Sequence, residues 1–286
     1  MTENAKNYDW GLESLHSILL EELLYVHEFC EENDIEYCLA YGSALGAKRH
    51  EGFIPWDDDV DIYMTLEGYE KFRGLFKQKG SEKYYLQEIR PINGMIVDAK
   101  LRINNTTYLE KLYKNYDMHQ GIYIDIFILF PAPKQTIKKM IMNIANQYLV
   151  FKELSNRHYV SRKAYVPLLA LMRIFPKDFL RKTALSILYK YRNCEFDEYY
   201  DTDLRKYSRS FWKKSTIFPL KKIKFENMQL YIPNDLETYL TKQYGDYRIV
   251  PSMENIKRAQ HSSLWRTDVD FRNYLKNIKD FKDERE

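Results

Sequence analysis

The sequence predicts an α/β (α+β) fold in which helices flank a mixed sheet, with a basic helical segment added in the middle of the chain. Two observations predict it. Stretches with helical apolar spacing alternate with short apolar runs typical of strands, and one long stretch is rich in lysine and arginine. The chain has 286 residues, 45% of them hydrophobic, which is enough for a sizeable core and excludes disorder as the overall state.

Residues 1–133 are predicted to form the core of this fold. From Leu12 to Asn33, apolar residues recur at three- and four-residue steps, as they do on one face of an amphipathic helix. Pro131 and Pro133 are expected to close this part of the chain. We expect strands at 35–40, 60–64, 84–89, 97–103 and 122–129, a turn at 42–43, and further helices at 44–49 and 66–79.

Residues 134–215 are predicted to form the basic helical segment. Between Lys134 and Arg192 there are thirteen Lys or Arg residues against two acids. This charge is either an ordinary solvated face or a surface attracted to anionic lipid or to an anionic glycan; the apolar stretch from Val166 to Phe175 favours peripheral docking on a membrane. Residues 216–286 are predicted to complete the core with a β-hairpin at 223–232, a helix at 234–243 and an irregular end.

Composition excludes several other classes of protein. The formal charge of +3 does not indicate a nucleic-acid binder, and no nucleic-acid partner is expected. The longest apolar stretch is about half the length that a bilayer span needs, and the first ten residues lack the apolar segment of a secretory signal. Three cysteines without a C-x-x-C pair argue against a disulfide framework and against a structural zinc site. We therefore expect a cytoplasmic protein.

The most informative stretch runs from Tyr41 to Tyr63, where a turn of small residues precedes a dense run of acids. If 60–64 is a strand, Asp59 and Asp61 project to the same side of it. Two converging carboxylates repel each other unless a cation lies between them, and such hard oxygen ligands suit Mg²⁺ or Mn²⁺. Free amide groups at Gly42 and Ser43 could hold a phosphate. The alternative is a solvated acidic loop.

A third acid supports a metal site. Asp125 is the sole charge within the run Ile122 to Phe130, which is apolar enough for a central strand. A charge in such a strand should be paired or bound to a metal. A structural salt bridge is the competing explanation for this residue.

These residues resemble those of a known family. The stretch from Gly42 to Ile62, the segment GIYIDIF around Asp125 and the later YLTKQYGDY from Tyr239 to Tyr247 closely resemble the LicD family of choline-phosphate transferases. That family in turn resembles the catalytic domain of the fukutin-related proteins. The resemblance implies a nucleotidyltransferase-like core that moves a phospho-alcohol group, such as phosphocholine or a phospho-polyol, from a CDP-linked donor to a sugar hydroxyl of a surface glycan.

The resemblance also implies roles for single residues. Asp59 and Asp61 match the metal-binding pair, Asp125 matches the third acid, and Gly42-Ser43 match the phosphate-binding turn. Tyr41 stands where most members would have Gly or Ala, so the walls of the turn are expected to differ here.

Cations near these acids are candidates for binding the donor. The family's K-x-R pair corresponds to Lys100 and Arg102, one of which is expected to contact phosphate oxygens; pairing with Asp98 is the competing explanation. Arg49 could bind the donor diphosphate. The alternative is that it is a cation at a solvated helix end, where positive charge is favoured by the helix dipole. His119 and His261 could act as bases, but a histidine without a visible partner is more often a packing or surface residue.

The sequence thus predicts a metal-dependent phosphotransferase that releases CMP. Asp59, Asp61 and Asp125 are its expected catalytic and metal-binding residues; Gly42, Ser43, Arg49, Lys100 and Arg102 are its expected substrate-binding residues. Its expected partners are a CDP-linked alcohol and a glycan or lipid-linked glycan acceptor, with membrane contact through 134–192 at the inner face of the membrane. One alternative is a nucleotidyltransferase that releases pyrophosphate from an NTP. Another is a non-catalytic membrane-associated scaffold, which the intact acids disfavour.

Overall fold

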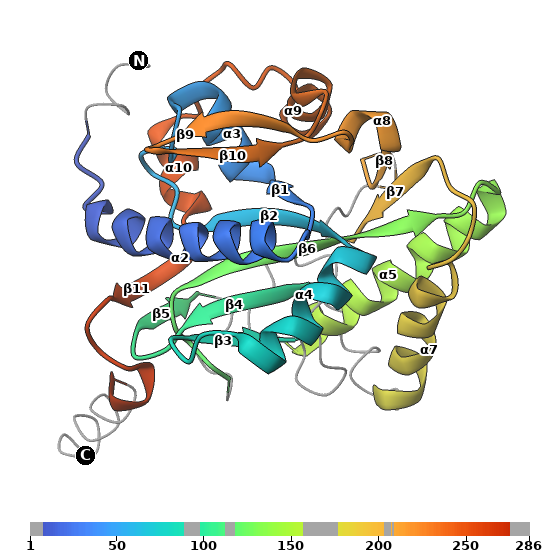
Figure 1. Cartoon of the computed structure of the whole chain (residues 1–286), viewed down its shortest axis with the longest axis horizontal. Coiled ribbons are helices and arrows are strands. Elements are labelled where there is room, and N and C mark those ends of the chain that lie inside the picture. Colours follow the sequence, from blue (N-terminus) through green and yellow to red (C-terminus); the bar gives the residue numbers. More distant parts are fainter. Residues whose placement is uncertain are drawn as a thin grey trace.

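The computed structural model describes residues 8–88, 98–111, 118–156, 177–202, 207 and 209–274 of the chain (Figure 1). A seven-stranded mixed sheet lies at the centre of the described residues, which confirms the predicted fold class. Its strands follow the order β1-β2-β6-β4-β3, while β7 pairs with both β6 and β8. The bounds are β1 (Tyr37–Leu39), β2 (Val60–Thr65), β3 (Tyr84–Gln87), β4 (Ala99–Ile103), β6 (Tyr123–Ala132), β7 (Glu198–Asp201) and β8 (Phe211–Lys213).

Strand β6 organises the sheet because it pairs with three other strands. β2 runs parallel to it and places Asp61 beside Asp125. β4 runs antiparallel along the other edge and places Lys100 opposite Asp125. Beyond the end of β4, β7 pairs with residues 129–132. β6 therefore continues through Pro131 to Ala132 and extends past the predicted end of the strand at residue 129.

Helices α2 (Glu13–Glu32) and α4 (Leu66–Lys79) cover one face of the sheet (Figure 1). Helix α2 buries residues of the predicted apolar stripe, namely Leu15, Leu19, Leu23, Val26 and Cys30. Helix α4 begins after Thr65, whose hydroxyl accepts a hydrogen bond from the Gly68 N–H. The rings of Phe29 in α2 and Phe72 in α4 are 5.2 Å apart, so the two helices lie side by side.

The middle of the chain forms helices α5 (Thr136–Asn156) and α7 (Lys177–Lys190), which pack against each other. The same part of the chain also supplies β7 and β8 and the short helix α8 (Lys214–Ile217), which the sequence does not predict. The division at residues 133 and 215 stays a prediction, and the stretch Val166 to Phe175 lies outside the described residues. Among the helices that the structure describes, none is both long and apolar enough to cross a bilayer.

The C-terminal part begins with the predicted hairpin. Strands β9 (Lys221–Phe225) and β10 (Met228–Ile232) pair around a turn at Glu226 and Asn227, and helix α9 (Leu236–Tyr244) follows. The predicted irregular end is wrong: helix α10 (Met253–Ala259) and strand β11 (Ser262–Arg266) form there. β11 pairs with β5 (Thr107–Glu110), far away in the sequence, which a local pattern cannot reveal.

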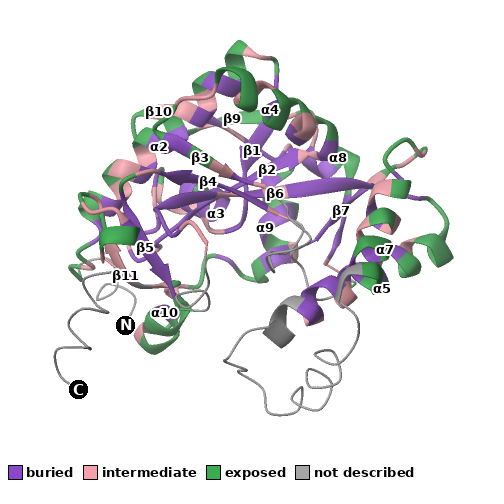
Figure 2. Cartoon of the chain, turned by 90° about the horizontal axis from the view of Figure 1, so that it is seen from below, coloured by how far each residue is buried: buried purple, intermediate pink, exposed green. Residues whose placement is uncertain are grey.

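Burial follows this arrangement. Figure 2 shows buried residues along the central strands and exposed residues on the outer sides of the helices. Strand β6 is buried at eight of its ten positions, as expected for a strand covered on both faces. Asp125 lies in this strand, so its charge requires partners.

Candidate active site

Three carboxylates converge where β2 and β6 begin. Asp59 directly precedes β2, Asp61 is its second residue, and Asp125 is the third residue of β6. Because Asp61 and Asp125 are register partners, their side chains point to the same face of the sheet. Each of the three acids offers one oxygen, and these oxygens lie within 4.8 Å of one another. The sequence predicts this convergence, while the catalytic role of the acids stays a prediction.

Without a cation, burial and mutual repulsion raise the free energy of the charged state of these three aspartates. Burial raises the pKa of Asp61 well above its usual value, and the charges of Asp59 and Asp125 raise it further. Burial also raises the pKa of Asp125, against the lowering effect of Lys100. An oxygen-only donor set of three carboxylates fits a hard divalent cation such as Mg²⁺ or Mn²⁺. The acids could therefore hold a metal ion.

Lys100 is the cation closest to Asp125 among the described contacts. Its Nζ atom lies 2.6 Å from Asp125 Oδ1 and 3.6 Å from Glu110 Oε2. It also lies 3.5 Å from the ring centre of Tyr123. Lys100, Asp125 and Glu110 all line the same cavity. The structure thus brings Lys100 to the predicted site, as an ion-pair partner of the third acid.

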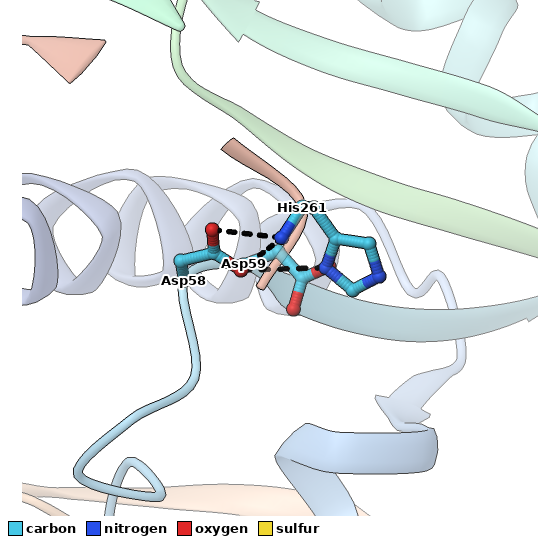
Figure 3. A group of neighbouring side chains, drawn as sticks. All are labelled: Asp58, Asp59 and His261. Atoms are coloured by element: carbon cyan, nitrogen blue, oxygen red, sulfur yellow. Dashed lines mark hydrogen bonds and ion pairs between the residues drawn. The ribbon is translucent and has the colours of Figure 1, made fainter. Parts of the chain in front are cut away.

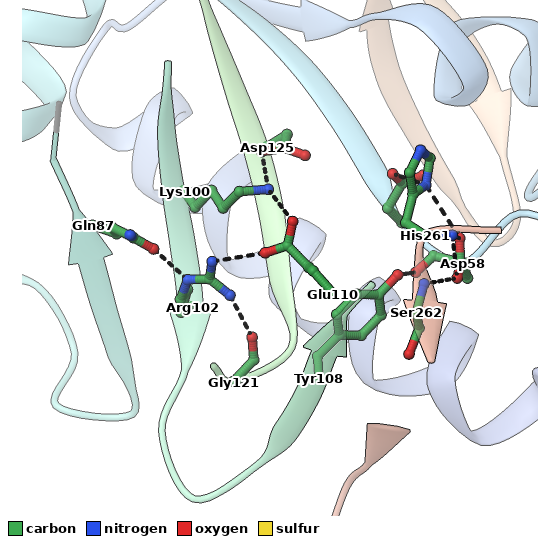
Figure 4. A network of polar contacts seen from close by, with 11 residues as sticks. Asp58, Gln87, Lys100, Arg102, Tyr108, Glu110, Gly121, Asp125, His261 and Ser262 are labelled. Carbon is green, nitrogen blue, oxygen red and sulfur yellow. Dashed lines mark hydrogen bonds and ion pairs between the residues drawn. The ribbon is translucent and has the colours of Figure 1, made fainter. Parts of the chain in front are cut away.

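Arg102 lies behind this layer. It is fully buried, and its guanidinium donates to Glu110 Oε1 at 3.0 Å and to the Gly121 carbonyl oxygen at 3.0 Å (Figure 4). It is not among the residues that line the cavity. These contacts hold Glu110 in place beside Lys100 (Figure 4). The predicted binding role of Arg102 stays a prediction, and its described contacts are those of a support for Lys100.

The start of helix α3 (Tyr41–His50) differs from the sequence prediction. The helix begins at Tyr41, because the Ala44 N–H already donates to the Ala40 carbonyl oxygen. Gly42 and Ser43 therefore lie in its first turn and do not form the predicted turn before the helix. The Ser43 hydroxyl instead accepts a hydrogen bond of 2.9 Å from the Asp61 N–H. This bond fixes the start of β2 against α3.

A glycine is required at residue 42 because an acidic side chain lies close to its backbone. A Cβ atom at this position would lie 2.4 Å from Oδ2 of Asp57. Burial raises the pKa of Asp57 well above its usual value, and the charge of Asp59 raises it further. Both Gly42 and Asp57 line the cavity, so any side chain at residue 42 would displace a fourth acid of the site.

Tyr41 connects this turn to the middle of the chain. Its backbone has a positive φ of 36°, and its N–H donates to the Tyr239 hydroxyl. Its own hydroxyl donates to Asp201 Oδ2 in β7 at 2.7 Å, an oxygen that also accepts from Tyr63 and from Trp212. Sequence reasoning missed Asp201, because the pattern of β7 gives no sign of its long-range partners.

Asp58 and His261 form a second group beside Asp59 (Figure 3). The Asp58 carboxylate accepts hydrogen bonds from the backbone N–H groups of His261 and Ser262, at 3.0 and 2.8 Å. The His261 ring Nδ1 lies 2.9 Å from Asp59 Oδ2 and 3.3 Å from Asp58 Oδ1. The charge of Asp59 raises the pKa of His261 well above its usual value, although burial opposes this. The sequence offered His261 only as an isolated histidine; its partners are acids about two hundred residues earlier.

Arg49 and aromatic side chains form another part of the cavity lining. Arg49 donates to the Tyr247 carbonyl oxygen at 3.2 Å and lies 5.7 Å from the ring centre of Trp56. Tyr244 lies in this part of the cavity, where desolvation by its surroundings and the charge of Asp61 raise its pKa well above its usual value. All four residues line the cavity, and the predicted role of Arg49 in binding the donor stays a prediction.

The cavity has a volume of about 730 Å³ and an acidic lining. Its cationic side chains are Arg49 and Lys100, with His261 at its edge. The acids that line it are Asp57, Asp59, Asp61, Asp98, Glu110, Asp125 and Asp246. A polyanionic donor would bind this lining only with additional positive charge, which a divalent cation would supply.

Residues 34–178 match the model of the family described as LicD/FKTN/FKRP, nucleotidyltransferase domain. The chain belongs to this family. The match spans the start of α3, all of β2 and all of β6, and so contains every predicted catalytic residue. The recognition of this family from the sequence is confirmed.

Two named relatives are transferases. The lipopolysaccharide cholinephosphotransferase LicD of Haemophilus influenzae is 27% identical over 250 residues, which cover 84% of this chain and 92% of that protein. The ribitol 5-phosphate transferase FKRP of Homo sapiens is 44% identical over 59 residues, which cover 20% of this chain and 12% of that protein. This member of the LicD family is accordingly an enzyme of the transferase class, as the sequence predicts.

Proposed function

We propose that this LicD-family enzyme transfers a phospho-alcohol group from a CDP-linked donor to a hydroxyl of a cell-surface glycan and releases CMP. The observation that carries the proposal is the placement of Asp59, Asp61 and Asp125 within 4.8 Å of one another in a large cavity that Lys100 and Arg49 also line. The names of the relatives support the coarser reaction: one transfers a choline phosphate to lipopolysaccharide, the other a ribitol 5-phosphate. We infer that the acceptor polymer is a teichoic acid, a capsule or a lipopolysaccharide.

We infer that the three aspartates hold Mg²⁺ or Mn²⁺. Bound there, the metal would neutralise negative charge on the donor diphosphate and on the transferring group. Arg49 would contact the diphosphate, and the backbone at Gly42, which lines the same cavity, would approach it closely. Lys100 would hold Asp125 in place through their ion pair of 2.6 Å.

In the reaction that we propose, the acceptor oxygen attacks the phosphorus atom that carries the alcohol. The new P–O bond forms in line with the bond to CMP, which breaks, and CMP leaves with the bonding electrons. The hydroxyl proton passes to water in the open cavity, and Asp125 would position the hydroxyl as it attacks. Attack on the other phosphorus would instead transfer the nucleotide.

Nucleotidyl transfer is the second candidate, because the matching family model is described as a nucleotidyltransferase domain. It would use the same acids and an NTP, and it would release pyrophosphate. We place either reaction in the cytoplasm, with peripheral contact at the inner face of the membrane through 134–192, and we expect no nucleic-acid partner.

The test is to measure CMP release from CDP-choline, CDP-ribitol, CDP-glycerol and CDP-ethanolamine, with a glycan-lipid extract, in Mg²⁺ or in EDTA. We expect CMP from one donor, only with metal. Asp59→Asn and Asp61→Asn should each lower turnover by several orders of magnitude, while the matched surface variant Asp268→Asn should not, because that side chain is 66% exposed. Pyrophosphate from an NTP without consumption of any CDP-alcohol would replace this proposal with nucleotidyl transfer. Near-normal turnover of either catalytic variant would refute the role of the acids.

A further inference from the structure

Helix α5 carries an exposed apolar stripe. Its four members are Ile137, Met140, Ile141 and Ile144, with exposed fractions of 72%, 51%, 42% and 64%. Spacings of three and four residues place them on one side of the helix. The other side packs inward through Met142, Ala145, Asn146 and Leu149, which are all buried. The stripe is thus an outward face of a helix that is already packed on the protein.

Among the described residues, exposed apolar side chains are most numerous on α5 and on α7, the helix that packs against it. Twelve large hydrophobic residues are exposed in the described part of the chain, and six of them lie on α5 and α7. Those on α7 are Phe179, with an exposed fraction of 74%, and Leu180, with 37%. Single exposed apolar residues are ordinary, but a concentration of this kind indicates an interaction surface.

Helices α5 and α7 carry more cations than acids, although the exposed acids Glu195 and Asp197 lie near the start of α5, where both pair with Lys134. Residues 136–152 of α5 contain three lysines and no acid, and α7 contains four cations and one acid. Lys139 pairs with Glu198 of β7. Lys138 and Lys182 are exposed and have no ion pair with any described residue. Lys138 borders the stripe, and the excess of cations on the two helices fits an anionic partner and would repel a second copy of the same face.

We propose that the exposed face of α5, together with the start of α7, docks on an anionic lipid bilayer. An amphipathic helix with isoleucines on one face and lysines beside them lies in the interface, with its apolar side chains among the acyl chains and its cations at the headgroups. This surface rests on the proposed function and deepens it, because it names the residues through which the segment 134–192 would contact the membrane; its test needs no measurement of the reaction.

The docked helix is connected to the cavity. Asn146, on the inner side of α5, donates to the Thr202 carbonyl oxygen at 2.7 Å. The Thr202 hydroxyl donates to Asp98 at 3.1 Å, and Asp98 lines the cavity. With the outer side of α5 on the bilayer, this hydrogen-bonded path would link the docked helix to the cavity lining at Asp98.

The test is co-sedimentation of the full chain with phosphatidylcholine vesicles, with and without phosphatidylglycerol. We expect retention on the anionic vesicles only, weakened by salt. The variant Ile137→Glu/Ile144→Glu should lose about 30-fold or more of its partition coefficient, because it removes two large apolar groups and adds charge. Leu24→Glu on α2 is the matched control: this leucine is also exposed, at 39%, but lies outside the stripe, so retention should not change. Circular dichroism and thermal unfolding should show that both variants fold.

A second variant separates charge from apolar contact. Lys138→Gln/Lys182→Gln should lower retention on anionic vesicles by about fivefold for each lysine and leave any residual binding to neutral vesicles unchanged. Equal retention of the unaltered chain on both kinds of vesicle, or no retention on either, would overturn the proposal. So would a dimer in sedimentation equilibrium that Ile137→Glu/Ile144→Glu dissociates, because the stripe would then be an interface between two copies.

Discussion

Asp61 offers a quantitative test of the idea that the site is built for a cation. Asp61 and Asp59 each place a carboxylate oxygen within 4.8 Å of the other. At an effective dielectric constant of about 20, two unit charges at this distance repel by about 3 kcal/mol. The chain can reduce this cost by protonating Asp61, which at pH 7 costs about 4 kcal/mol relative to an unfolded aspartate. The free-energy cost of the Asp59–Asp61 pair is therefore similar whether Asp61 stays charged or becomes protonated.

Replacing Asp61 by Asn removes this cost and keeps the backbone N–H that donates to Ser43. In EDTA at pH 7 we expect Asp61→Asn to raise the free energy of unfolding by about 2 kcal/mol, while turnover falls by orders of magnitude. The pKa of Asp61 is raised in the folded chain, so its contribution to stability is present at low pH and is lost as pH rises above the unfolded value. The difference between the two proteins should therefore grow from pH 4 to pH 7.

The assay is urea unfolding in EDTA and in Mg²⁺. Mg²⁺ should stabilise the unaltered protein strongly and Asp61→Asn weakly. The control is Asp246→Asn, the same chemical change in the same cavity at a side chain that is 57% exposed, and it should leave stability within about 0.5 kcal/mol. If Asp61→Asn lowers stability in EDTA, or if Mg²⁺ shifts both proteins equally, the carboxylates are not a strained cation site.

Two further predictions concern packing and pH. Gly42→Ala should lower the free energy of unfolding by about 1 to 3 kcal/mol, although alanine favours helices, because its Cβ would lie 2.4 Å from the Asp57 carboxylate; a variant as stable as the original in urea would contradict this. His119 donates through Nε2 to Asn104 and accepts at Nδ1 from the Gly121 N–H, so it is neutral, and burial lowers its pKa to about 4. Because the unfolded histidine takes up a proton first, stability should fall by about 1 kcal/mol between pH 8 and pH 5, after allowance for the partial exposure of the ring. His119→Gln should remove that part of the slope, and unchanged slopes in urea titrations would exclude the mechanism.

Local pattern was sufficient to predict the centre of the sheet. The apolar run around Asp125 can be buried only as a central strand, and alternation along β2 places Asp59 and Asp61 on one side. The convergence of these acids follows from the parallel pairing of two such strands. The predicted roles of the acids remain to be tested.

Contacts between distant segments could not be predicted in this way. Serine is a common residue just before a helix, but the Ser43 hydroxyl accepts a hydrogen bond from the Asp61 N–H. The helix begins at Tyr41, two residues before Ser43. The partners of Asp58 and Asp201 lie about two hundred and up to 160 residues away, so no periodicity indicates them. Strands β7 and β11 are short, and their pairing with distant segments, β6 and β8 for β7 and β5 for β11, stabilises them as strands.

The hydrogen bonds from His261 and Ser262 to Asp58 have a consequence for biosynthesis. A ribosome extends the chain from its N-terminus, so the acidic loop that contains Asp58 emerges long before His261 and Ser262, which bind it. During that interval the sheet can pair β2 with β6, but the loop before β2 lacks its two backbone donors. Contacts of such high sequence separation form late and slowly. We therefore expect nascent chains to acquire a folded core before they acquire an ordered acidic loop, so that catalytic competence arises only once strand β11 has been synthesised.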